Sequence, residues 1–231
     1  GVDCRSYGIV VLEQPQYVRA EARATFTDVP GRSGALVTLE SGEVYNDLTL
    51  IVKCLIRDKT HIPEINQWLR GGGTLELSSR PFDYYCGYNV HYDARIINQV
   101  EFEQVMRGNT QQFINLTFRA KPFLIAENVA PVELTVSDST LFNPCNIETE
   151  PKITVYGTGD ITLYVNAYQV ELDGVDGYIV VDSEITECYK DFTLTNSKMT
   201  GEFPILAEGL NMISWDGEVT KVVIEPRWRW L

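Results

Sequence analysis

The chain has 231 residues, a formal net charge of −13 and a hydrophobic fraction of 44%, a composition typical of a globular protein with one large or two small domains. No apolar run approaches the roughly 18 residues of a membrane-spanning helix, so no membrane insertion is predicted. The cysteines are odd in number and irregularly spaced, which argues against a disulfide framework and a CxxC-type zinc site; they are Cys4, Cys54, Cys86, Cys145 and Cys188.

Charge is unevenly distributed along the chain. Residues 1–130 carry 13 basic and 15 acidic side chains, a net charge of −2, whereas residues 131–231 carry 6 and 17, a net charge of −11. Because an acidic surface repels phosphate backbones, nucleic-acid binding by the second half is disfavoured.

The first half predicts β-strands and a single short helix. Residues 47–57 (DLTLIVKCLIR) alternate apolar and polar side chains, which indicates a half-buried strand with Cys54 as a core residue. Residues 59–73 predict the helix: Thr60 or His61 can cap it, Pro63 suits its first turn, and three glycines end it. Further strands are expected over residues 74–79, 88–105 and 111–123.

The second half predicts a β-sandwich of many short strands. A change of composition over residues 124–136 places the domain boundary between residues 129 and 130. Asp216 and Gly217 predict a two-residue hairpin turn. The strands are expected over residues 152–157, 160–166, 168–174, 177–184, 211–217 and 218–228.

The chain ends in PRWRWL, residues 226–231, which alternates arginine with tryptophan. In a strand, Trp228 and Trp230 share the face of Val222 while the arginines face away. The alternative is nucleic-acid binding, with arginines on phosphates and tryptophans on bases, which the acidic second half disfavours. Pro226 fits an edge strand or a bulge, and a bulge would reverse the parity of the tryptophans.

No catalytic or ligand-binding constellation is visible in the sequence. The acids of residues 173–177 (DGVDG) lack the ligand spacing of a calcium loop, and Asp182 and Glu184 are expected on a solvated strand face. His61 and His91 are isolated, and no nucleophile elbow, HExxH or Walker motif occurs. We therefore predict no enzyme activity and no catalytic, cofactor-binding or metal-binding residues.

A series of stretches in a fixed order resembles the distal tail protein (Dit) family of long, flexible-tailed bacteriophages. These stretches are residues 7–15, 29–36, 42–56, 65–81, 118–123, 150–166, 176–184, 196–217 and 219–231. The chain departs from the family pattern at Cys145, where a glycine is expected, and at Asn166-Ala167, which replaces an Asn-Gly hairpin turn. Local loop geometry is therefore in question at these two places.

The resemblance implies a mainly β fold, with an N-terminal β-sandwich-type ring domain that contains one short helix (residues 1–129) and a C-terminal galectin-like β-sandwich (residues 130–231). It implies a structural virion protein of phage or prophage origin. Six copies would form a hub ring where the tail tube meets the tail tip or baseplate, and DNA would pass through its channel.

The resemblance also implies the partners and the location of the protein. The partners are other copies of the chain, the tail tube protein and tail-tip, tail-associated or receptor-binding proteins, without specific nucleic-acid binding. The protein would reside at the virion tail tip, after assembly in the cytoplasm of the bacterial host.

Two sets of residues are singled out as structural candidates. The loop of Pro30, Gly31, Arg32, Ser33 and Gly34 is the candidate oligomer interface, because its glycines permit a tight backbone path and Arg32 can pair with an acid on a neighbouring subunit. An ordinary surface turn is the alternative. Trp68, Trp228 and Trp230 are candidate structural anchors.

A carbohydrate-binding module of a tail adsorption apparatus is the alternative function. A sandwich with tyrosines such as Tyr164, Tyr168 and Tyr178 offers rings that can stack on sugars. Fold alone does not establish this function.

Overall fold

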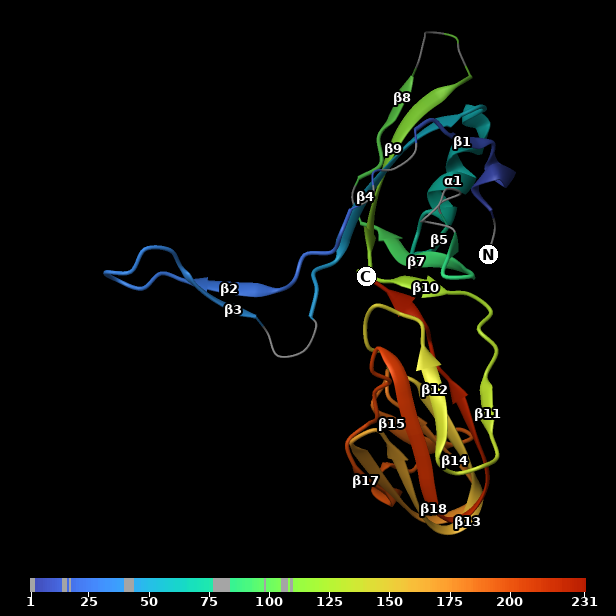
Figure 1. Ribbon diagram of the computed structural model, residues 1–231. Coiled ribbons are helices and arrows are strands. Elements are labelled where there is room, and N and C mark those ends of the chain that lie inside the picture. The colour runs from blue at the N-terminus through green and yellow to red at the C-terminus, as the bar shows by residue number, and fades with distance from the viewer. Residues whose placement is uncertain are drawn as a thin grey trace. The chain divides into compact units, whose positions relative to one another are not determined.

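The chain, seen in a computed structural model, forms two compact units that are not contiguous in sequence (Figure 1). The first comprises Gly1–Asp83, His91–Leu124 and Leu231, and the second Tyr84–Val90 and Ile125–Trp230. The structure describes residues 3–13, 16, 18–39, 44–76, 84–97, 99–104, 108 and 110–231. The predicted mainly β fold is confirmed, and within these residues the only α-helix is a short one in the first unit.

The first unit is built on an antiparallel sheet in which strands lie in the order β1-β4-β9-β7, with β8 on β9 and β5 on β7. Strands β2 and β3 form a separate two-stranded sheet. The elements are η1 (Cys4–Tyr7), β1 (Ile9–Val11), β2 (Ala24–Thr27), β3 (Leu36–Leu39), β4 (Leu48–Ile56), η2 (Lys59–His61), α1 (Ile62–Trp68), β5 (Gly72–Leu75), β7 (Tyr88–Ile96), β8 (Phe102–Gln104) and β9 (Gln112–Ala120).

Strand β4 confirms the strand predicted over residues 47–57. Its alternate residues are buried, and it pairs with β9 along its whole length, from Leu48 opposite Ala120 to Ile56 opposite Gln112. The strand predicted over residues 74–79 is observed as Gly72–Leu75, and residues 77–79 lie outside the described part of the chain.

Helix α1 begins with a proline in its first turn, as predicted, but its capping differs from the prediction. Neither Thr60 nor His61 caps with its side chain; instead the Asp58 carboxylate accepts a hydrogen bond from the Thr60 N–H (3.0 Å) and caps the preceding 3₁₀ turn η2. Ile65 is fully buried and joins α1 to the core beneath β4.

The second unit is a β-sandwich whose strands follow the order β11-β18-β13-β14-β15-β16, with β12 on β18 and β17 on β14. Its elements are β6 (Tyr84–Tyr85), β10 (Leu124–Ala126), β11 (Val132–Leu134), β12 (Ser139–Asn143), β13 (Lys152–Val165), β14 (Tyr168–Asp182), β15 (Glu187–Lys190), β16 (Thr193–Leu194), η3 (Asn196–Lys198), β17 (Met199–Gly201), β18 (Gly209–Glu225) and β19 (Arg229–Trp230).

The three longest strands, β13, β14 and β18, are hydrogen-bonded neighbours with β13 in the middle, and the pairing of β13 with both neighbours is interrupted midway. The first part of β18 pairs with β12, and its last part pairs with β11. The pairing of β13 with β18 shifts register between Thr158 and Thr162. Such irregularities bend a strand and let it turn the corner between two layers.

Two glycines at this corner allow the backbones to approach closely. A Cβ on Gly157 would lie 2.3 Å from the Glu218 carbonyl oxygen, and one on Gly217 would lie 2.6 Å from the Asp160 carbonyl oxygen. The hairpin turn predicted at Asp216-Gly217 is therefore wrong, because β18 continues through this dipeptide and bends there.

The turn at Asn166-Ala167 keeps its two-residue geometry without glycine. Val165 pairs with Tyr168, and Asn166 adopts the left-handed conformation at φ 53°. The Asn166 side-chain oxygen accepts a hydrogen bond from the Met212 N–H (2.9 Å), which holds this conformation. Cys145, the other departure from the family pattern, does not have a positive φ, so its position does not require glycine.

Backbone hydrogen bonds of Ala126 and Glu127 connect segments of the second unit that are far apart in sequence. The Glu127 N–H donates to the Asn89 carbonyl oxygen (2.8 Å), and the Ala126 N–H donates to the Trp228 carbonyl oxygen (2.9 Å). In the described part of the chain, no helix is long and apolar enough to cross a membrane.

Candidate assembly surfaces

The two-stranded sheet β2–β3 (blue in Figure 1) exposes large apolar side chains. Phe26 and Val37 are directly opposite one another and are 69% and 52% exposed. Leu36 at the start of β3 is 44% exposed. Clustered apolar side chains outside a core are typical of a surface that another chain covers.

The candidate interface loop Pro30–Gly34 lies in the connection between these two strands. Gly31 and Gly34 have φ of 80° and 81°, the left-handed region that favours glycine. The Arg32 N–H donates to the Val29 carbonyl oxygen (3.1 Å) and closes a tight turn. The Arg32 side chain is exposed, and no carboxylate within the described ranges pairs with it. The turn therefore presents an exposed guanidinium in the connection between β2 and β3.

A groove of about 720 Å³ opens on the first unit. Its charged side chains form two ion pairs, Arg119 Nε with Asp47 (2.5 Å) and Lys121 Nζ with Asp93 (3.4 Å). Arg95 lies directly opposite Arg119 on the neighbouring strand, an arrangement of like charges that is unfavourable by itself. The groove is lined by Asp47, Gly72, Gly73, Thr74, Asp93, Ala94, Arg95, Ile97, Arg119, Ala120 and Lys121.

Trp68, the first of the three candidate anchors, is half-buried at the end of α1. Its ring lies 5.7 Å from the ring of Tyr7 and packs against the core cluster that contains Ile65. It joins the helix to the N-terminal 3₁₀ turn of the first unit.

Trp228 and Trp230 are buried in the second unit, 4% and 1% exposed. The rings of Tyr85 and Tyr88 lie 5.5 and 5.9 Å from the Trp230 ring, and the Trp230 indole Nε1–H donates to the Pro144 carbonyl oxygen (3.3 Å). Alternate residues from position 222 to 230 are all buried, so the proline at 226 does not reverse the parity.

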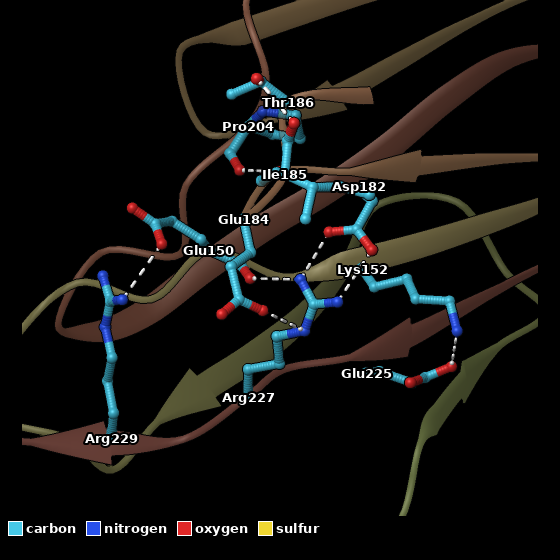
Figure 2. A network of polar contacts seen from close by, with 11 residues as sticks. Glu150, Lys152, Asp182, Glu184, Ile185, Thr186, Pro204, Glu225, Arg227 and Arg229 are labelled. Carbon is cyan, nitrogen blue, oxygen red and sulfur yellow. Dashed lines mark hydrogen bonds and ion pairs between the residues drawn. The ribbon is translucent and has the colours of Figure 1, made fainter. Parts of the chain in front are cut away.

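The two arginines that alternate with the tryptophans bind carboxylates of the second unit (Figure 2). Arg227 donates two hydrogen bonds to Asp182, at 2.6 and 2.8 Å, and its Nε lies 3.2 Å from Glu184. Arg229 pairs with Glu150 at 3.1 Å. The hydrogen bonds to Asp182 raise the pKa of Arg227 above its usual value.

Asp182 corrects one sequence-based expectation. It was expected on a solvated face, but it is only 3% exposed and is neutralised by Arg227. The paired carboxylates Asp182 and Glu184 thus bind one structural arginine. The alternation of PRWRWL predicted only that the arginines face away from the tryptophans, and it did not indicate that they bind acids.

The three tyrosines considered for sugar stacking do not gather in one place. Tyr178 lies opposite Tyr156, with ring centroids 5.7 Å apart and a lysine ammonium over each ring. Tyr164 is opposite Gln169 instead, and Tyr168 is opposite the buried Val165. Partners opposite one another share a sheet face, so Tyr164 and Tyr168 lie on opposite faces.

All five cysteines are free, and burial raises the pKa of Cys54 and of Cys145 to about 12. Cys86 is exposed. We expect iodoacetamide at pH 8 to label Cys86 in the native protein and to label Cys54 and Cys145 only after unfolding, because the thiolate is the reacting form. Peptide mapping by mass spectrometry checks this. Equal labelling rates of Cys54 before and after unfolding would contradict it.

By its architecture the chain is a two-unit β protein, a sheet unit with one short helix combined with a β-sandwich. Among solved structures it is similar to "Crystal Structure of SPP1 Dit (gp 19.1) Protein, a Paradigm of Hub Adsorption Apparatus in Gram-positive Infecting Phages", with a TM-score of 0.72 and 14% identity over 98% of this chain and 95% of that one. The resemblance to Dit proteins is thereby confirmed for the fold. No protein-family model and no curated protein matches the sequence.

Proposed function

We propose that the chain is a structural protein of a phage tail, of phage or prophage origin. It acts as the distal hub that joins the tail tube to the tail tip or baseplate. The observation that carries this proposal is the likeness of fold to the SPP1 Dit protein, which extends over nearly the whole of both chains. The proposal assigns no enzymatic activity to the protein.

In this proposal six copies form a ring, with the domain of residues 1–129 around a channel and a galectin-like domain of residues 130–231 at the periphery. The exposed apolar pair Phe26 and Val37 supports self-association, because another copy that covers these side chains removes apolar surface from water. The ring faces bind the tail tube protein and the tail-tip or receptor-binding proteins. The protein assembles in the host cytoplasm and resides in the virion.

DNA leaves through the channel without adhering to it. The nearly neutral residues 1–130 offer no dense cationic groove, and the acidic residues 131–231 repel phosphates. Weak contact with phosphates allows the DNA to slide with its counterions.

Electron microscopy of the purified full chain tests the proposal. A six-membered ring with an open channel is the expected result. Particles without a channel at every concentration at which the protein is soluble would rule out the hub.

We expect Phe26→Asp to raise the protein concentration needed for ring assembly at least about tenfold. The reason is that an apolar side chain that the proposed interface covers is replaced by a charge. Light scattering at a series of concentrations measures this effect. Arg32→Glu should also weaken assembly if the loop Pro30–Gly34 contacts the neighbouring subunit. Phe192→Asp is the matched control, because Phe192 is fully exposed in the second unit. An unchanged ring in Phe26→Asp would exclude the β2–β3 sheet from the interface.

A further inference from the structure

Strand β12 is an unprotected edge of the second unit. It pairs with β18 on one side, and within the described ranges no strand pairs with its other side. The other edge strands of this sandwich, β11, β16 and β17, are only two or three residues long, whereas β12 has five and contains no charged residue, proline or glycine. Proteins normally shorten or charge their edges to prevent pairing with other chains, so β12 lacks the usual protection.

The outer face beside this edge is apolar. Phe142 on β12 lies opposite Leu210 on β18, and Thr140 lies opposite Met212. The three large side chains Phe142, Leu210 and Met212 are 63%, 65% and 59% exposed. They form a continuous strip over two strands, which would lose much of its contact with water if a third strand were added at β12.

Each end of the edge carries an exposed carboxylate. Asp138 directly precedes β12, and Glu208 directly precedes Gly209, which lies opposite the last residue of β12. Neither carboxylate has an ion-pair partner within the part of the chain that the structure describes. Two copies of β12 paired edge to edge would bring acidic ends together, so the charges favour a different, basic occupant.

We propose that β12 binds an extended segment of another protein by strand addition. The segment carries apolar side chains at alternate positions, which cover Phe142, Leu210 and Met212, and lysine or arginine at both ends, which pair with Asp138 and Glu208. Asp138 and Glu208 flank the five paired residues of β12 and are six steps of about 3.3 Å apart along the strand, which sets the spacing of the basic ends at roughly 20 Å. Backbone hydrogen bonds supply affinity, and the alternate side chains and the terminal charges supply specificity. This site is separate from the β2–β3 sheet and does not depend on ring assembly.

The test uses the full chain and two fluorescent peptides of alternating valine and threonine, one with two lysines at each end and one with two glutamates. Fluorescence anisotropy should show at least about tenfold tighter binding of the lysine peptide. Hydrogen exchange measured by mass spectrometry should show slower exchange of Ser139–Asn143 in the presence of that peptide.

Three variants distinguish peptide binding at β12 from nonspecific binding elsewhere on the protein. Phe142→Lys should reduce binding of the lysine peptide at least about tenfold, whereas Phe192→Lys, a matched change of an exposed phenyl ring elsewhere, should leave it unchanged. The double variant Asp138→Lys with Glu208→Lys should reverse the preference and favour the glutamate peptide. All four substituted side chains are exposed, and thermal melting checks that the three variants are folded.

The proposal is overturned if neither peptide binds at millimolar concentration, if both bind equally, or if protection appears away from β12. It is also overturned if Phe142→Lys changes the number of copies in the assembly without affecting the peptide, since a second copy would then be the occupant. A failure to form rings would contradict the hub and leave the peptide result standing.

Discussion

Replacing Arg227 by alanine is expected to lower the free energy of unfolding by roughly 3–5 kcal/mol, because a buried carboxylate loses the arginine that forms an ion pair with it. Asp182 is 3% exposed and accepts both of its short hydrogen bonds from Arg227. Urea unfolding followed by tryptophan fluorescence is a suitable measurement, since Trp215, Trp228 and Trp230 all lie in the second unit.

Two variants serve as controls for this result. Arg227→Lys keeps the charge but loses the bidentate hydrogen bonding to Asp182, so we expect an intermediate loss of stability. Arg229→Ala should cost less, because Glu150 is partly exposed and water can solvate it. If Arg227→Ala and Arg229→Ala lowered stability equally, the special role of Asp182 would be wrong.

The elements that sequence predicted well are those that local patterns determine. Period-two alternation predicted β4, because every second residue of Leu48–Ile56 faces the core. A proline in the first turn and three following glycines predicted α1. The alternation in PRWRWL predicted that the two tryptophans share a buried side. Both are buried, although the predicted continuous strand is interrupted, because β18 ends at Glu225, Arg227 has a φ of 52° and β19 begins at Arg229.

The features that sequence did not predict depend on contacts between distant residues. Asp182 and Arg227 are 45 positions apart, and their pairing requires the ends of β14 and β18 to meet. Likewise, the Asn89 carbonyl oxygen accepts a hydrogen bond from the Glu127 N–H, which lies 38 positions further along the chain. Nothing in a local pattern specifies such partners.

The dipeptide at Asp216-Gly217 shows why a strong local signal can mislead. Its composition is typical of a hairpin turn, but glycine also allows two backbones to approach closely. The approach of Gly217 to the Asp160 carbonyl oxygen requires the second property. The pairing of β13 with β18 is what shows that Asp216 and Gly217 lie within a continuous strand and do not form a hairpin turn.

The candidate assembly surface was only partly visible in the sequence. The glycines of Pro30–Gly34 predicted a tight turn, and the structure contains one. The exposure of Phe26 and Val37 was not predictable, because an alternating strand is equally compatible with burial of either face. The alternation does not specify whether a core or another chain covers that face.

Trp230→Ala is expected to lower the free energy of unfolding of the second unit by about 3–5 kcal/mol. The indole is 1% exposed, contacts the rings of Tyr85 and Tyr88, and fills a site that these side chains cannot refill when it is removed. Since Tyr85 and Tyr88 belong to the segment 84–90, losing the indole should also loosen that segment. Urea unfolding measures the first effect, and faster hydrogen exchange of residues 84–90 under native conditions measures the second.

The matched variant Trp230→Phe separates packing from hydrogen bonding. Phenylalanine keeps an aromatic ring against the two tyrosines but cannot donate to the Pro144 carbonyl oxygen, so we expect a cost of about 1–3 kcal/mol, clearly below that of alanine. Trp215→Ala should cost less than Trp230→Ala, because Trp215 is only half-buried. If a chain truncated before Trp228 unfolded at the same urea concentration as the full chain, the terminal strand would not anchor the second unit. Because both buried tryptophans and the Arg229 contact to Glu150 are lost together, we expect truncation to cost more than any single substitution among the removed residues.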